Sequence, residues 1–298
     1  MSRRAMLLFA ALSLIWGFPY LFIRVAVDDL DPTVLVFGRC LVGALTLLPF
    51  TVRRPGSRAV LRRWRVVLLY TCVEVAGPWW LLSDAEQHVS SSFAGLVICL
   101  VPLLGAVFGL LLHDDDRLDG RRAAGLLIGL VGIVLLLGID VNRLSPWPVV
   151  EVMLTATGYA LGPFIVDRAL SDLPAIDVNL VVLGITALGY LPFAVLRRPH
   201  QVPPIEAVLS VVVLGVACTA IAFLLIFALI GEIGPARATV ITYVNPAVAI
   251  AAGVVLLGET LTAGMLIGFP LVLAGSMLAT WRRGKREPLT AQPVSPAV

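Results

Sequence analysis

An acidic and a basic side chain stand out because each lies inside a long apolar stretch. Glu74 lies near the middle of residues 66–82, and Arg39 lies within residues 34–52. If both stretches are helices that span a membrane, the two side chains lie about 12 and about 9 Å from the same membrane surface at 1.5 Å per residue. An ionisable side chain inside a membrane is costly and marks functional sites. We therefore propose that Glu74 and Arg39 can pair.

Two interpretations of this pair remain open. In the first, Glu74 and Arg39 form a fixed structural ion pair, or Glu74 stays protonated and hydrogen-bonded. In the second, a substrate or a proton competes for Glu74 and so couples to a conformational switch. Burial disfavours a charged carboxylate whereas a neighbouring guanidinium favours it, so breaking the pair would promote protonation. Protons are therefore a candidate partner.

Aromatic side chains accompany these charges at helical spacing. Tyr70 precedes Glu74 by four residues, and Trp16 and Tyr20 are four residues apart in the first apolar stretch. Residues four apart share a face of a helix, so each pair can line a binding site. Tyr159 offers a similar surface in the sixth stretch. The alternatives are that Tyr70 anchors its helix at the membrane surface and that the other aromatic residues only pack between helices.

A polar face is expected in the ninth apolar stretch. Thr239, Thr242 and Tyr243 share one side of that helix, with Asn245 beside them. Such groups in an apolar cleft suit a ligand, although threonine hydroxyls also bond to their own helix. The candidate substrate-binding residues are Trp16, Tyr20, Arg39, Tyr70, Glu74, Tyr159, Thr239, Thr242, Tyr243 and Asn245.

The sequence contains no recognisable pattern of catalytic or metal-binding residues. Its four cysteines lie inside apolar runs without metal-ligand spacing, and its three histidines lie in separate polar connectors. The acidic run 114–116 is flanked by arginines, which predicts a solvated turn rather than a metal site. Motifs of hydrolases, metalloproteases and nucleotide-binding enzymes are missing. We predict no catalytic residue, no metal, no cofactor and no enzymatic activity.

The composition indicates a membrane protein. Of 298 residues 59% are apolar and 14% are charged, with a mean hydropathy of +0.98, whereas soluble domains carry about 45–50% and about 25%. This excludes a soluble enzyme and a disordered chain. The net charge of +3 is too small to attract a polyanion, so no nucleic-acid partner is expected.

Ten apolar stretches approach the roughly 20 residues that a spanning helix needs. They are Met6–Val27, Val34–Val52, Val66–Leu82, Phe93–Leu112, Ala123–Ile139, Val149–Val166, Val178–Leu196, Ala207–Ile230, Ala238–Leu257 and Leu261–Trp281. The predicted fold is an all-α membrane protein with ten transmembrane helices. Residues 284–298 contain three prolines and no apolar face, which predicts a disordered cytoplasmic tail.

An internal repeat divides the chain. A shift of 144 residues aligns Pro19 with Pro163, Arg24 with Arg168, Asp28 with Asp172, residues 53–55 with 197–199, and Pro102 with Pro246. The expected domains are residues 1–143 and 144–283, each with five helices. Because five is odd, the second unit enters the membrane from the opposite side, which gives two inverted repeats.

The distribution of charge predicts the orientation. Seventeen of the 22 basic residues fall on the side of the N-terminus, four fall on the other side, and Arg39 lies within a helix. Basic loops stay in the cytoplasm. We therefore expect a multi-pass protein of the plasma membrane with both termini in the cytoplasm.

Several motifs connect the chain to a known family. Two units of five helices, Trp16-Gly17 and the intramembrane Phe37-Gly38-Arg39 resemble the EamA-type drug/metabolite transporters. The same resemblance extends over Pro102…Asp116-Arg117-Leu118…Gly125 and Pro246…Gly258-Glu259-Thr260-Leu261…Gly268. The chain departs from the family at Asp116, where glutamate is usual, and at Ala160-Leu161, where the Trp-Gly pair is not repeated.

The resemblance implies a central cavity lined by the first four and the sixth to ninth helices. It also implies movement of small organic solutes, often outward, by alternating access. The fifth and tenth helices would form a scaffold. Their glycines at 125, 129, 132, 264, 268 and 275 let helices approach closely, either inside the chain or in a homodimer through these two helices.

The predicted function is therefore secondary transport, with export favoured. The aromatic residues and the acid suggest an apolar or aromatic amino-acid-like solute or an organic cation as the small-molecule substrate. No ATP-binding motif is present, so a gradient would drive movement. The alternatives are a non-transporting membrane sensor or assembly protein and a membrane-embedded enzyme.

Overall fold

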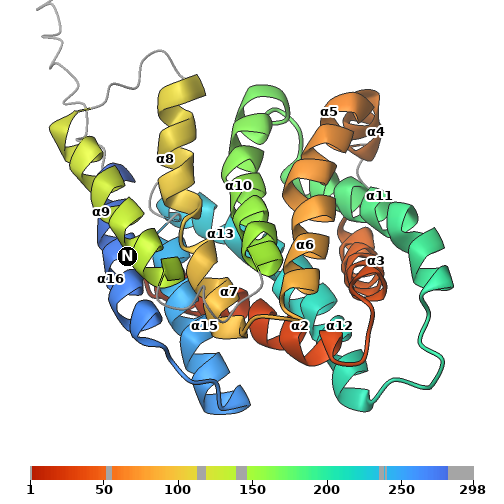
Figure 1. Cartoon of the computed structure of the whole chain (residues 1–298). Coiled ribbons are helices and arrows are strands. Elements are labelled where there is room, and N and C mark those ends of the chain that lie inside the picture. The colour runs from red at the N-terminus through yellow and green to blue at the C-terminus, as the bar shows by residue number, and fades with distance from the viewer. Residues whose placement is uncertain are drawn as a thin grey trace, which may run out of the picture.

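The computed structural model describes residues 2–51, 56–112, 119–138, 146–234, 238 and 240–280. Within these ranges the regular structure is entirely helical (Figure 1). The first half comprises α1 (Arg3–Gly17), α2 (Pro19–Val27), α3 (Pro32–Thr51), α4 (Gly56–Arg62), α5 (Trp64–Tyr70), the π-helix η1 (Thr71–Ala76), α6 (Gly77–Ala85), α7 (Ser91–Ile98), α8 (Val101–Leu112) and α9 (Gly120–Gly138). The second comprises α10 (Pro146–Ala169), α11 (Ala175–Leu196), α12 (Ile205–Gly215), the π-helix η2 (Val216–Ile221), α13 (Ala222–Ile233), α15 (Ile241–Leu257) and α16 (Ala263–Thr280).

Eight helices are long and apolar enough to cross a membrane. They are Arg3–Val27, Pro32–Thr51, Trp64–Ala85, Ser91–Leu112, Pro146–Ala169, Ala175–Leu196, Ile205–Ile233 and Ala263–Thr280. The apolar helix α15 has 17 residues, and α9 has 19. The all-helical membrane class is confirmed, whereas the count of ten spans stays a prediction.

Two breaks within the spanning helices coincide with prolines. Pro19 is the first residue of α2, directly after Phe18 separates α2 from α1. A second break separates α7 from α8 just before Pro102. Proline has no N–H and cannot continue the hydrogen-bond ladder. In a bundle, packing against neighbouring helices tolerates such breaks.

The glycines of α9 and α16 bring these two helices together within the chain. A Cβ added at Gly125 would lie 2.5 Å from the backbone nitrogen of Ala279, and one added at Gly132 would lie 2.8 Å from that of Val272. Figure 1 shows α9 and α16 side by side along one edge of the molecule, while α3 and α11 pack together at the other. These glycine faces therefore serve internal packing, so a dimer would have to use other faces.

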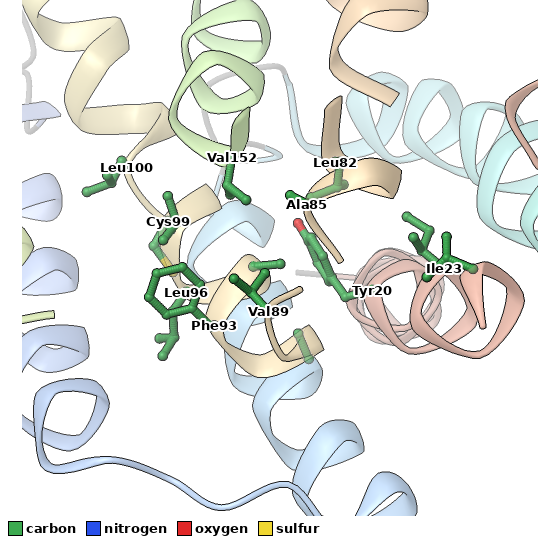
Figure 2. Close-up of a cluster of buried hydrophobic side chains, with 14 of the residues drawn as sticks. Tyr20, Ile23, Leu82, Ala85, Val89, Phe93, Leu96, Cys99, Leu100 and Val152 are labelled. Carbon is green, nitrogen blue, oxygen red and sulfur yellow. The ribbon is translucent and has the colours of Figure 1, made fainter. Parts of the chain in front are cut away.

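The core between the two halves is apolar. Figure 2 shows part of it: Phe93, Leu96 and Cys99 of the α7 segment lie near Val152 of α10, and the Tyr20 hydroxyl points toward Ala85. Cys40, Cys99 and Cys218 are buried, as the apolar runs around them predict, whereas Cys72 is exposed.

The segment Gly258-Glu259 of the family motif connects the end of α15 to the start of α7. Gly258 caps α15 with φ +67°, a left-handed conformation that glycine adopts without strain. The carboxylate of Glu259 then accepts hydrogen bonds from the backbone N–H groups of Ser91 (2.7 Å) and Ser92 (2.9 Å). An acid at this position satisfies the free N–H groups of a helix N-terminus. The first-half motif at Asp116, together with Thr239 and the tail 284–298, lies outside the described residues.

Candidate functional site

Arg39 lies at the centre of the site. It is only 6% exposed. Its Nε donates a hydrogen bond to Oγ1 of Thr219 (3.1 Å), and its Cζ lies 3.6 Å from the centroid of the Trp79 ring. The Trp79 contact is a cation–π interaction. No ion pair among the described residues joins Arg39 to an acid.

The possible pair between Arg39 and Glu74 is therefore not formed in this structure. Glu74 instead faces α10, where a side chain at Gly162 would collide with its carboxylate. Its Oε2 is buried without a hydrogen-bond partner. Helical rise predicts the depth of the two residues but not the direction of their side chains. The π-helical turn that carries Glu74 changes that direction, while Trp79 and Thr219 hold the guanidinium.

Two π-helical segments carry Glu74 and Thr219. η1 lies between α5 and α6, and η2 lies between α12 and α13; η2 begins 145 residues after η1. Glu74 is the fourth residue of η1, and Thr219 is the fourth residue of η2. π-Helical turns are rare and occur frequently at functional sites. The sequence analysis missed Thr219, although the internal repeat offered a signal by aligning its helix with that of Glu74.

Pro78 gives a physical reason for the first π-helical turn. It has no N–H to donate, so the preceding turn cannot keep a regular α-helical ladder. The carbonyls nearby bond to other helices: that of Ala76 accepts from the Tyr190 hydroxyl (2.9 Å), and that of Pro78 accepts from Thr155 (3.2 Å). The helix stays continuous, and its altered turn is fixed from α10 and α11.

Two tyrosines lie near the guanidinium. Tyr159 lies beside Trp79 and within electrostatic reach of both Arg39 and Glu74. Tyr20 is 8% exposed and packs in the core near these groups. Trp79 is buried, so it does not anchor the helix at the membrane surface. The site thus joins α2, α3, α6, α10 and η2.

Glu86, which the sequence analysis did not single out, adds a second buried acid. It caps α6 and is fully buried, and neither carboxylate oxygen has a hydrogen-bond partner. Burial raises the pKa of this carboxyl well above its usual range, and nearby Glu259 acts in the same direction, against Arg24 and Arg39. A carboxyl so far from water favours its neutral form.

The remaining candidates lie elsewhere. Trp16 packs against the apolar cluster of α1 and α13. The hydroxyl of Tyr243 forms a hydrogen bond with that of Thr280 on α16 (2.8 Å), away from Arg39. The carbonyl of Asn245 lies against Gly17, and its side-chain oxygen is buried without a partner.

Two further predictions are resolved only in part. Tyr70 lies within electrostatic reach of Glu74, but no hydrogen bond between them is formed. Thr242 keeps a polar contact. The ninth helix thus places the backbone of Asn245 next to α1, and a continuous polar wall along this helix stays a prediction.

The geometry leaves a basic and an acidic side chain in one interior without ionic partners. Arg39 offers a buried guanidinium with no acid, and Glu74 offers a carboxylate oxygen with no donor. A guanidinium binds a carboxylate through two parallel hydrogen bonds. Such an arrangement can receive a solute that carries an anionic and a cationic group beside an apolar body.

Known proteins resemble the chain over nearly its full length. The "Uncharacterized inner membrane transporter YedA" of Escherichia coli (strain K12) is 28% identical over 278 residues, which cover 91% of this chain and 88% of that protein. A "Probable terminal-alkyne amino-acid exporter" of Streptantibioticus cattleyicolor is 26% identical, and the alignment covers 91% of this chain and 92% of that protein. A "Probable amino-acid metabolite efflux pump" of Salmonella typhimurium is 22% identical, and the alignment covers 92% of this chain and 94% of that protein.

A solved structure and a family model agree with these similarities. A solved crystal structure aligns with a TM-score of 0.65 at 24% identity, covering 93% of this chain and 96% of that chain, which shows the fold. The names of the relatives indicate a multi-pass membrane transporter rather than an enzyme. The EamA-like transporter family matches twice, over residues 3–138 and 146–281, and the chain belongs to that family.

Proposed function

We propose that this protein exports small amino-acid-like metabolites with apolar or aromatic side chains. The substrate carboxylate would bind Arg39, and its ammonium group would approach Glu74. Trp79, Tyr159 and Tyr20 would surround the apolar part. The observation that carries this proposal is the buried guanidinium of Arg39, which has a hydroxyl and an aromatic face as neighbours but no paired acid.

Energetic reasoning supports a ligand for Arg39. An uncompensated buried charge costs several kcal/mol, and Thr219 and Trp79 compensate for only part of that cost. A charge that is kept under these conditions is explained by an anionic group that binds there during the transport cycle. Two relatives are named "Probable terminal-alkyne amino-acid exporter" and "Probable amino-acid metabolite efflux pump", and an amino acid carries such a group.

Glu74 is the candidate coupling residue. Its unpaired oxygen can accept a proton or the ammonium group of a substrate, but not both at full strength. Competition between them would link the direction of solute movement to a proton gradient. Tyr159 lies within electrostatic reach of Arg39 and Glu74 and so connects the two binding groups.

Alternating access by two inverted units completes the proposal. Equivalent helices of the two halves pack against each other, as α3 does with α11 and α9 with α16, and each half carries a π-helical segment at an equivalent position. These pairings support a pseudo-two-fold axis between ten spans. The protein would lie in the plasma membrane with both termini in the cytoplasm, as its positive charges predict.

Counterflow in proteoliposomes tests the proposal. Vesicles loaded with unlabelled phenylalanine, leucine or another amino acid of a panel should accumulate the labelled form. Arg39→Gln should lower the rate by roughly 10- to 100-fold, because a hydrogen-bonded charge contributes about 1.5–3 kcal/mol. Arg39→Lys should restore part of it, since lysine keeps the charge but loses the planar fork.

A matched control is Arg65→Gln. Arg65 also lies over a tryptophan, Trp64, at 5.4 Å, but it is exposed. Its loss should leave counterflow unchanged. Absence of counterflow with every carboxylate-bearing solute of the panel, or wild-type rates in Arg39→Gln, would contradict the proposal.

A further inference from the structure

A crevice outside the Arg39 site lies between the α5–η1–α6 helix and α11. It has a volume of about 530 Å³, within the 300–1,000 Å³ typical of small-molecule sites. The start of α3 closes one end. Neither Arg39 nor Glu74 lines it, so it is separate from the proposed transport site.

The end of the crevice near α3 carries more acidic than basic groups. Arg197 forms an ion pair with Asp31 (3.2 Å), and Asp31 also accepts a hydrogen bond from the backbone of Thr33. Asp84 has no such cation; its carboxyl meets that of Glu151 on α10. Glu151 is fully buried, and neither of its oxygens has a hydrogen-bond partner with good geometry. Two adjacent carboxyls without an ion pair among the described residues attract a cation.

The walls of the crevice are aromatic. Trp80 lines one side, and Tyr190 and Phe193 line the other with ring centroids 6.3 Å apart. The hydroxyl of Tyr190 is held by the carbonyl of Ala76, which fixes the ring. At Gly189 a Cβ would meet nothing within 4 Å, so the glycine leaves free space beside these rings. Aromatic faces attract cations and cover apolar groups.

We propose that this crevice binds an amphipathic organic cation, with its ammonium group at Asp84 and its apolar body along Trp80, Tyr190 and Phe193. The site is additional to the proposed transport site and does not depend on it. A lipid chain or detergent would fill the same walls without regard to the sign of a charge. The charge of the ligand therefore distinguishes these occupants.

Cys72 supplies a native reporter for occupancy. It lines the crevice and is exposed, whereas the other three cysteines are buried. We would measure its alkylation by N-ethylmaleimide with mass spectrometry in nanodiscs. The probes are 4-phenylbutylammonium, 4-phenylbutyrate and 4-phenylbutanol, which share one apolar body and differ in charge. At ten times its Kd the cation should slow labelling about ten-fold, while the anion and the alcohol should have little effect.

Isothermal titration calorimetry with the same three probes gives an independent measurement. Only the cation should produce a binding isotherm. Asp84→Asn should weaken binding at least ten-fold, and Gly189→Phe should abolish it by filling the free space. Gly184→Phe is the matched control, because Gly184 is also on α11 with nothing near a Cβ but does not line the crevice.

Three outcomes would overturn the proposal. Equal protection by the cation and the alcohol would identify a lipid-like groove. Cation binding that survives Asp84→Asn would show that Asp84 does not bind the ammonium group. Binding that is lost in Glu74→Gln but kept in Asp84→Asn would locate the cation at the interior acid instead. If Gly189→Phe fails to fold, Asp84→Asn and the charge series still decide.

Discussion

The two π-helical segments share a backbone design but differ in chemistry. In η1 the fourth residue is Glu74, an acid pressed against the α10 backbone with one oxygen unpaired. In η2 the fourth residue is Thr219, a neutral hydroxyl that accepts a hydrogen bond from Arg39. Pro78 follows η1, whereas no proline follows η2 before α13 continues. The same irregular turn thus carries a buried acid in one half and a partner of a base in the other.

This difference separates architecture from function in a duplicated protein. A π-helical turn inserts an extra residue and so redirects a side chain without breaking the helix. Two such turns lie at equivalent positions in the two halves. Because only one turn carries an acid, the two halves cannot bind the same group. The asymmetry suits a solute with two different charged ends.

The largest expected effect comes from removing the acid. Glu74→Gln should lower counterflow of an amino-acid substrate by roughly 10- to 100-fold, because it removes a charged hydrogen-bond acceptor. It should also make the remaining rate independent of pH. The measurement is initial counterflow between pH 5.5 and 8.5. A variant with the wild-type rate and pH profile would show that Glu74 takes no part in transport and that η1 has only a structural role.

A second test removes the space that Glu74 occupies. Gly162→Ala adds a Cβ that collides with the Glu74 carboxylate. We expect a loss of about 1–3 kcal/mol in stability, as for other overpacked sites, together with slower counterflow. Gly184→Ala adds a Cβ in open space and should leave both unchanged. Equal melting temperatures of the two variants in detergent would show that Glu74 does not rest against α10.

The third test concerns η2 and should have a smaller effect. Thr219→Val keeps the shape of the side chain but removes the acceptor for Arg39. Losing one hydrogen bond costs about 1 kcal/mol of binding free energy, so substrate affinity should fall roughly five-fold. The apparent Kd from titration calorimetry checks this. An effect as large as that of Glu74→Gln would mean that the two segments are functionally equivalent after all.

Much of the fold was predictable from the sequence because apolar length and composition determine which segments enter a membrane. The membrane class follows from such local patterns, and so does close helix packing at the glycines of α9 and α16, one of the two uses expected for them. Family membership followed from the motif at Gly258-Glu259. Its role as a helix cap did not, because it depends on the contact of Glu259 with Ser91 and Ser92, distant in the sequence.

The candidate site was harder to predict, since side-chain direction depends on the local helix type. The possible pairing of Arg39 with Glu74 assumed regular α-helices. One extra residue in the turn at η1 turns Glu74 toward Gly162, and Trp79 offers the guanidinium an aromatic face. Tyr243 shows the same difficulty: it shares a helix face with its polar neighbours but bonds to Thr280 of the scaffold.

The smallest effect concerns the surface anchors of the two helices that contain these segments. At the start of α5, Arg63 binds Asp172 through two hydrogen bonds of 2.6 and 2.7 Å. At the end of α13, Glu232 contacts Arg4 at 3.3 Å. The hydrogen bond from Arg63 holds the pKa of Asp172 below its usual range. The stabilisation is therefore present at neutral pH and is lost as the pH falls through this lowered pKa.

Asp172→Asn should lower the melting temperature slightly at pH 7, because both side chains are largely in water, where ion pairs contribute little. The difference from wild type should vanish below the lowered pKa of Asp172, where the wild-type carboxyl is also neutral. Glu232→Gln should have a still smaller effect, since its contact with Arg4 is longer and its other partner, the Ser2 hydroxyl, can also donate a hydrogen bond to an amide oxygen. A difference for Asp172→Asn that persists unchanged into acid would mean that the residue acts through packing rather than charge, and that the base of the η1 helix is not held by its ion pair.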